Sequence, residues 1–251
     1  MATVLLVRHG RTAANTAGVL AGWTPGIGLD DHGRQQAETM AARIAAAGIE
    51  IRRVVSSPLQ RCQETAAIVA ATVADGIPVE EDERLGEAHY GSWTGRKLAE
   101  LAKEDLWRVV QDQPSAARFP DGDEFPGESM AQMQSRALDA VRSLDAEVEK
   151  AHGPDAVWVA VSHGDVIKAV LADAAGAHLD QFQRILVDPA SVSVVRYTAR
   201  RPFLLRSNDN GGDLGGLKPP PPKPPESPPE TPSESPPEAD RGDAAVGGGA
   251  G

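Results

Sequence analysis

Two histidines stand at the ends of apolar runs in this sequence, and each is followed by a glycine. His9 follows Thr3–Val7, and His163 follows the run at 156–162. Histidine can attack an electrophile or carry protons near neutral pH, and glycine lets a ligand approach the backbone. Arg8 adds a planar, bidentate donor for an oxyanion. If the two strands are parallel neighbours, about 4.8 Å apart, both imidazoles could face one bound group.

Two further side chains could complete such a site. Arg61 lies in the first turn of a helix expected at about 58–74, which Ser57 would cap and Pro58 would begin. The exposed amides and positive dipole at that helix end favour phosphate binding. Glu87, in a glycine-rich loop, supplies a carboxylate. Together these groups indicate an anion pocket with a nucleophile and an acid, which is what phosphoryl transfer requires.

Other histidine chemistries agree less well with the sequence. A zinc site needs more ligands at recognisable spacing, and the chain has no HExxH or HxH motif and one cysteine, Cys62. A serine hydrolase would need a G-x-S-x-G elbow, which is absent, and Ser162 and His163 would point to opposite sides of one strand. We therefore expect no metal and no other cofactor. A neutral histidine can attack phosphorus directly while a protonated Glu87 supplies a proton to the leaving oxygen.

Hydrophobic patterns and turn residues predict the elements that position these groups. Strands are expected at 3–7, 51–56, 78–80, 156–162, 184–187 and 191–199, with an edge at 202–205. Helices are expected at about 34–47, 58–74, 97–112, 129–150 and 165–175. The runs that are apolar throughout indicate strands buried on both faces, as in a parallel sheet.

The composition separates a folded part from a C-terminal tail. Of the 20 prolines, 11 lie between Pro219 and Pro237, in a segment that also contains Glu, Ser and Thr. Such a segment buries too little apolar area to offset its ordering entropy. We expect one catalytic domain over residues 1–206 and a disordered Pro/Glu/Ser/Gly-rich tail over 207–251. The tail could be a solvated spacer or a ligand for a partner that binds Pro-rich motifs.

Charge and cysteine content narrow the class of protein. The net charge is −11 without a basic block, which argues against nucleic acid as a partner and gives no support for membrane binding. A single cysteine excludes a disulfide framework. The sequence shows no signal peptide and no run of transmembrane length. These features predict a soluble cytoplasmic protein, and the anion pocket described above predicts a small phosphorylated substrate.

Four segments form a combined signature: LVRHGRT at 6–12, SSPLQRCQETA at 56–66, GEAHYG at 86–91 and VSHGD at 161–165. In this order they resemble the histidine phosphatase superfamily, in its phosphoglycerate mutase-like branch. The resemblance covers nearly all of residues 3–200. It implies an α/β fold, a three-layer sandwich whose mostly parallel sheet has helices on both faces.

The same resemblance implies roles for individual residues. His9 would be the phosphorylated nucleophile, and Glu87 would be the proton donor and then the base for water. The phosphoryl group would be held by the catalytic residues Arg8, Arg61 and His163. Further substrate-binding groups would be Thr12, Asn15, Gly22, Tyr90 and Gly164.

Within this family the choice lies between a phosphatase and a mutase. Cofactor-dependent mutases share Tyr90 and carry two adjacent arginines further along the chain, which grip the substrate carboxylate. The corresponding segment, 112–118, contains Arg118 and no such pair. We therefore expect a phosphatase. The alternative is a phosphomutase, because the chain is also similar to an actinobacterial group regarded as phosphomutases. A second alternative is a catalytically inactive phosphate-binding module whose Pro-rich tail recruits partners.

Overall fold

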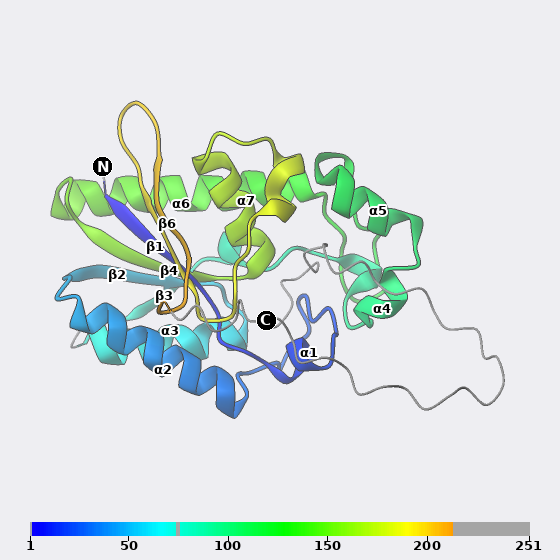
Figure 1. The fold of residues 1–251 in the computed structure, drawn as a ribbon, viewed down its shortest axis with the longest axis horizontal. Coiled ribbons are helices and arrows are strands. Elements are labelled where there is room, and N and C mark those ends of the chain that lie inside the picture. The colour runs from blue at the N-terminus through cyan, green and yellow to red at the C-terminus, as the bar shows by residue number, and fades with distance from the viewer. Residues whose placement is uncertain (1, 74–75, 213–251) are drawn as a thin grey trace, which may run out of the picture.

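The computed structural model describes residues 2–73 and 76–212, and most of the expected tail lies outside these ranges. One sheet has the strand order β3-β2-β4-β1-β5-β6 (Figure 1). The strand bounds are Thr3–Arg8 for β1, Ile51–Ser56 for β2, Val79–Glu81 for β3, Val157–Ser162 for β4, Val192–Arg196 for β5 and Phe203–Asp209 for β6. Strands β3, β2, β4 and β1 are parallel, and β5 and β6 are antiparallel to their neighbours. The prediction of a mostly parallel sheet is confirmed.

Helices cover both faces of this sheet. Their bounds are Ala13–Thr16 for α1, Asp31–Ala46 for α2, Gln60–Val73 for α3, Leu98–Leu101 for α4, Asp105–Asp112 for α5, Met130–His152 for α6 and Gly164–Ala174 for α7. Helices α2 and α3 pack on one face and α6 and α7 on the other, which makes three layers (Figure 1). None of the helices in the described part of the chain has the length and apolar character needed to cross a bilayer.

Strand β1 shows why its sequence is apolar throughout. Leu5 and Val7 pack against α2 and α3, whereas Val4 and Leu6 pack against the layer of α6 and α7. Successive side chains of a strand point to opposite faces, so a strand between two helical layers needs apolar residues at every position. This burial fixes the position at which β1 ends and the loop with His9 begins.

The structure corrects several expected boundaries. Helix α3 begins at Gln60 instead of 58, and Leu59 rather than Ser57 precedes it, because the helical amides of Cys62 (2.8 Å) and Gln63 (3.1 Å) bond to the carbonyl oxygen of Leu59. The single helix expected at 97–112 is two helices, α4 and α5. Glu104 breaks it with extended backbone angles, while its carboxylate accepts a bond from Trp93 Nε1 (2.8 Å).

The last third of the chain also differs from expectation. The segment 184–187 is not a strand, since its first residue ends a 3₁₀ helix (Leu179–Arg184), and β5 is shorter than the expected 191–199. Strand β6 continues to Asp209, three residues past the expected domain boundary at 206. Cross-strand pairing with β5 holds this extension in the sheet, whereas 213–251 lies outside the described residues.

Gly10 allows the loop after β1 to approach α2 closely. A Cβ atom at this position would lie 2.3 Å from the backbone oxygen of Gly33. We expect Gly10→Ala to lower the free energy of unfolding by roughly 1–3 kcal/mol, because backbone must move to admit the methyl group. Thermal denaturation measures the change, with Thr16→Ala, an exposed position in the same segment, as the control. An unchanged melting temperature for Gly10→Ala would contradict this packing.

Candidate active site

Strands β1 and β4 bring His9 and His163 together at their carboxyl ends. The two strands pair in parallel with Arg8 opposite Ser162, so the histidines follow at matching positions. Their ring centroids lie 5.3 Å apart at an interplanar angle of 61°. Both side chains are buried, His9 at 3% exposure and His163 at 0%. The prediction that the two imidazoles meet is confirmed.

The protonation pattern of His9 follows from its neighbours. Nδ1 lies 2.8 Å from the carbonyl oxygen of Gly10, so this nitrogen carries the proton. Nε2 then has the lone pair, and it accepts a bond from Arg61 Nε at 3.3 Å. Burial lowers the pKa of His9 well below its usual value, and the charges of Arg61 and Arg8 lower it further. The imidazole is therefore neutral at pH 7, which is the form that can act as a nucleophile.

Arg61 lies in the first turn of α3 and joins three parts of the site. Its Nη2 donates to the carbonyl oxygen of Gly22 (2.9 Å) and lies 3.2 Å from His163 Nδ1. Its Nη1 is buried and has no hydrogen-bond partner among the described residues. An unpartnered guanidinium nitrogen is costly in the interior. An oxyanion bound beside His9 would satisfy it.

Contacts at both ring nitrogens fix the orientation of the His163 side chain. Because Nδ1 accepts from Arg61, Nε2 carries the proton and donates to Ser57 Oγ at 2.8 Å. Burial, followed by the charge of Arg61, lowers the pKa of His163 well below its usual value. This residue is the N-cap of α7, and Gly164 is the first residue of that helix. The amides at this helix end are suited to an anion.

Glu87 is a buried carboxyl group beside the two histidines. Its Oε2 lies 3.7 Å from His163 Nδ1, and its Oε1 accepts a bond from the Ala88 amide at 3.0 Å. Burial raises the pKa of Glu87 to about 7, and the charge of Asp165 contributes to the rise. The carboxyl group can therefore both give and take a proton near neutral pH.

The backbone of the Glu87 loop is held in place from two sides. Trp23 Nε1 donates to the Glu87 carbonyl oxygen at 2.7 Å, and Arg136 Nη2 donates to the same oxygen at 2.8 Å. Arg136 also donates to the carbonyl oxygens of Arg84 and Gly86 and bonds to the Glu128 carboxylate. The loop thus holds its carboxyl group at a defined position.

Arg8 ends β1 and is completely buried. Its Nη1 donates to the carbonyl oxygen of Val187 at 2.8 Å. Burial lowers the pKa of Arg8, and the carboxylates of Glu87 and Asp165 oppose this effect. Arg8 and Arg61 therefore place two guanidinium groups around His9.

The remaining predicted residues fall into two groups. Thr12 and Asn15 form a capping box at α1, in which Asn15 Oδ1 accepts from the Thr12 amide (3.0 Å) and hydroxyl (2.9 Å). This leaves the Nδ2 group of Asn15 as the part that could donate to a ligand. Tyr90 is fully buried and its hydroxyl donates to Asp165 Oδ2 at 2.8 Å. The expected contact between Tyr90 and the substrate stays a prediction.

Sequence reasoning missed four polar residues that support the site: Ser57, Arg136, Asp165 and Lys168. Ser57 and Asp165 stand within the signature segments, next to residues that were singled out. Lys168 carried a weaker signal, as a lone lysine in the otherwise apolar stretch Val166–Ala172. Arg136 lies on the polar side of an amphipathic helix, and its role depends on distant contacts that the sequence does not reveal.

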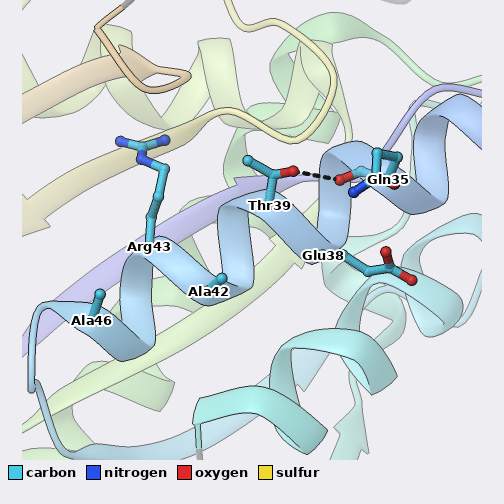
Figure 2. Close-up of a pocket in the computed structure, with 6 residues that line it drawn as sticks. All are labelled: Gln35, Glu38, Thr39, Ala42, Arg43 and Ala46. Atoms are coloured by element: carbon cyan, nitrogen blue, oxygen red, sulfur yellow. Dashed lines mark hydrogen bonds between the residues drawn. The ribbon is translucent and has the colours of Figure 1, made fainter.

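A separate hollow lies on the outer face of α2 (Figure 2). It is lined by Gln35, Glu38, Thr39, Ala42, Arg43 and Ala46. A second hollow lies where β1, β4, β5 and β6 meet, and its lining is mainly aliphatic. Neither includes a residue of the histidine cluster, so both are distinct from the candidate active site.

The profile of the histidine phosphatase superfamily (branch 1) matches residues 4–210. Among curated relatives, phosphoserine phosphatase 1 of Hydrogenobacter thermophilus is 30% identical over 211 residues, which are 83% of this chain and 92% of that protein. A 2,3-bisphosphoglycerate-dependent phosphoglycerate mutase of Caulobacter vibrioides is 30% identical over 188 residues, which are 68% of this chain and 79% of that protein.

The solved structure of YhfR from Bacillus stearothermophilus has a similar fold. Its TM-score is 0.72 at 27% sequence identity, and the match covers 83% of this chain and 98% of that chain. The α/β sandwich inferred from the sequence is therefore confirmed by comparison as well as by the strand order.

Proposed function

This chain belongs to branch 1 of the histidine phosphatase superfamily, and we propose that it hydrolyses a small phosphomonoester through a phosphohistidine formed on His9. One observation carries the proposal. The Nε2 lone pair of a buried, neutral His9 faces the guanidinium of Arg61, whose Nη1 has no partner in the described part of the chain. A phosphoryl group bound to that guanidinium would lie next to the nucleophilic nitrogen.

The first step transfers the phosphoryl group to the enzyme. His9 Nε2 attacks phosphorus in line with the ester oxygen, so that an N–P bond forms as the P–O bond breaks. The protonated carboxyl of Glu87 gives its proton to the departing oxygen, which leaves as an alcohol. Arg8, Arg61 and the amino end of α7 stabilise the negative charge on the equatorial oxygens.

The second step returns the enzyme to its starting state. The Glu87 carboxylate takes a proton from a water molecule as the water oxygen attacks phosphorus. The N–P bond breaks, and inorganic phosphate leaves. His9 regains its neutral form with the proton on Nδ1, and Glu87 is protonated again. The same carboxyl group therefore acts as acid and base in turn.

The pKa of Glu87 predicts how the rate depends on pH. The free enzyme must hold this carboxyl protonated to begin the first step, and its pKa is raised to about 7. We expect kcat/KM for an alkyl phosphate to fall about tenfold per pH unit above this value, as Glu87 loses its proton. A pH–rate profile tests this, and a rate that stays constant from pH 7 to 9 would contradict it.

Three arginines that could have held a second anionic group are bonded to other side chains, which favours hydrolysis over mutase chemistry. Arg118 is exposed and donates to Gln132 Oε1 at 2.9 Å, so it does not form a second anion clamp beside His9. Arg11 is paired with Asp30, and Arg96 is paired with Glu104. A mutase must hold a second anionic group of its substrate or cofactor, and these arginines are engaged elsewhere.

A panel of phosphomonoesters tests the proposed function. It includes phosphoserine, sugar phosphates, and 3-phosphoglycerate with 2,3-bisphosphoglycerate, and it is assayed in excess chelator because neither step uses a metal. His9-dependent release of phosphate supports the phosphatase. Interconversion of phosphoglycerates without net release would establish a mutase instead. Activity that is lost with chelator and restored by zinc would reject the histidine mechanism.

A further inference from the structure

Ser57 is a buried serine that the proposed steps do not use, although it contacts a residue of the site. Ser57 and His163 are both 0% exposed, and Ser57 Oγ lies 2.8 Å from His163 Nε2. The other ring nitrogen, Nδ1, lies 3.2 Å from Arg61 Nη2 and 3.7 Å from Glu87 Oε2. The imidazole therefore has Ser57 on one edge and the groups that surround the nucleophile on the other.

The backbone holds Ser57 between the two elements that it connects. Its amide donates to the carbonyl oxygen of Val161 on β4 at 3.0 Å. Its Oγ accepts a second bond from the amide of Leu59, the residue before α3, at 3.3 Å. Ser57 is thus bonded both to the strand that ends at His163 and to the start of the helix that carries Arg61. Its hydroxyl has a defined position relative to both side chains.

We propose that Ser57 is a positioning residue: its hydroxyl oxygen holds the proton of His163 on Nε2 and so turns an unprotonated Nδ1 toward the phosphoryl group. The inference rests on the proposed function, because it takes a phosphoryl group as the ligand. Ser57 itself does not touch the reacting atoms. It acts through the imidazole of His163.

An unprotonated Nδ1 suits one charge form of the substrate. A phosphomonoester monoanion has one P–OH group, which can donate to the Nδ1 lone pair in place of Arg61. When the proton crosses this bond, the O–H bond breaks and an N–H bond forms, which leaves a phosphoryl dianion beside an imidazolium. His163 then donates from Nδ1 to the phosphoryl oxygen and from Nε2 to Ser57 Oγ. The serine oxygen can accept the Nε2 proton in both states.

Cys62 is the other group close to Nε2, and it cannot replace Ser57. Its Sγ lies 3.4 Å from that nitrogen, and its thiol donates to the carbonyl oxygen of Ser162 at 3.5 Å. Burial raises the pKa of the thiol to about 12, so it stays protonated and is a weak acceptor. Without the Ser57 hydroxyl, an N–H at Nε2 would lack a good acceptor in the interior, which favours the opposite tautomer.

Nitrogen NMR of histidine-labelled protein tests the inference, with inorganic phosphate as the ligand and His163→Asn to assign the signals. In the empty wild type we expect a protonated Nε2 and an unprotonated Nδ1. Saturating phosphate at about pH 6, where the monoanion is abundant, should make both nitrogens protonated. Ser57→Ala should shift the tautomer ratio of the empty enzyme toward Nδ1–H by roughly tenfold or more, and its Nε2 should stay unprotonated with phosphate. Ser57→Thr keeps a hydroxyl and should restore the wild-type pattern.

Ser56→Ala is the matched control, because this buried hydroxyl donates to the Ser57 carbonyl oxygen at 2.9 Å. It should keep the wild-type signals. A proton on Nδ1 of the empty wild type, an unchanged pattern in Ser57→Ala, or the same change in Ser56→Ala would overturn the inference. If Ser57→Ala does not fold, the wild-type signals and their response to phosphate decide the question. The proposed function fails separately, if wild type shows no His9-dependent release of phosphate from the ester panel.

Discussion

Replacing His9 with alanine is expected to abolish phosphate release and to lower kcat by roughly four to six orders of magnitude. In the proposed mechanism His9 Nε2 is the atom that attacks phosphorus in the first step, before water attacks in the second. Its removal leaves Arg8, Arg61 and His163 in place, so the substrate can bind without reacting. A coupled assay for inorganic phosphate measures the loss on the best substrate of the panel.

The control for this experiment is His152→Ala, at the exposed end of α6. It should keep the wild-type rate, and both variants should keep the wild-type melting temperature within a few degrees. A folded His9→Ala protein with more than a tenth of the wild-type rate would show that phosphate release does not pass through His9.

Replacing Glu87 with glutamine is expected to separate good leaving groups from poor ones. The amide can still accept the bond from Ala88 but cannot supply a proton. Turnover of an alkyl phosphate should fall by roughly 10²–10⁴-fold, the usual contribution of a general acid. Hydrolysis of p-nitrophenyl phosphate should fall much less, because p-nitrophenolate leaves without protonation. Steady-state kinetics on both substrates measure the two losses.

Glu38→Gln, on the exposed side of α2, provides the control for a lost carboxylate. It should leave both rates unchanged. Equal losses on the two substrates in Glu87→Gln would remove Glu87 from the acid role. A larger loss on p-nitrophenyl phosphate would indicate that activation of water, and not departure of the alcohol, is what this residue chiefly provides.

The core of the site could be predicted because it depends on short-range patterns. Two fully apolar runs each end in a histidine and a glycine, and parallel pairing of β1 with β4 is enough to bring these histidines together. Arg61 followed from its place in the first turn of a helix. These inferences needed only the location of each strand or helix end, and the sequence specifies these ends through Gly, Ser and Pro.

The features that escaped prediction depend on contacts between distant segments. The break between α4 and α5 occurs at Glu104, whose carboxylate is held by Trp93 and Arg96. Nothing in the sequence indicated that the Tyr90 hydroxyl is bound to Asp165, 75 residues further along the chain. The charge pair of Asp165 and Lys168 on α7 looked like part of an ordinary helix start until its burial was known. Local propensity carries no information about such contacts.

Trapping the covalent intermediate tests the central claim most directly. Wild-type enzyme is mixed rapidly with its best substrate, quenched in base because phosphohistidine is labile in acid, and analysed by peptide mass spectrometry. We expect one phosphoryl group on the peptide that contains His9, increased in Glu87→Gln with p-nitrophenyl phosphate and absent in His9→Ala. A phosphorylated residue other than His9, or turnover without any covalent phosphoenzyme in both wild type and Glu87→Gln, would contradict the mechanism.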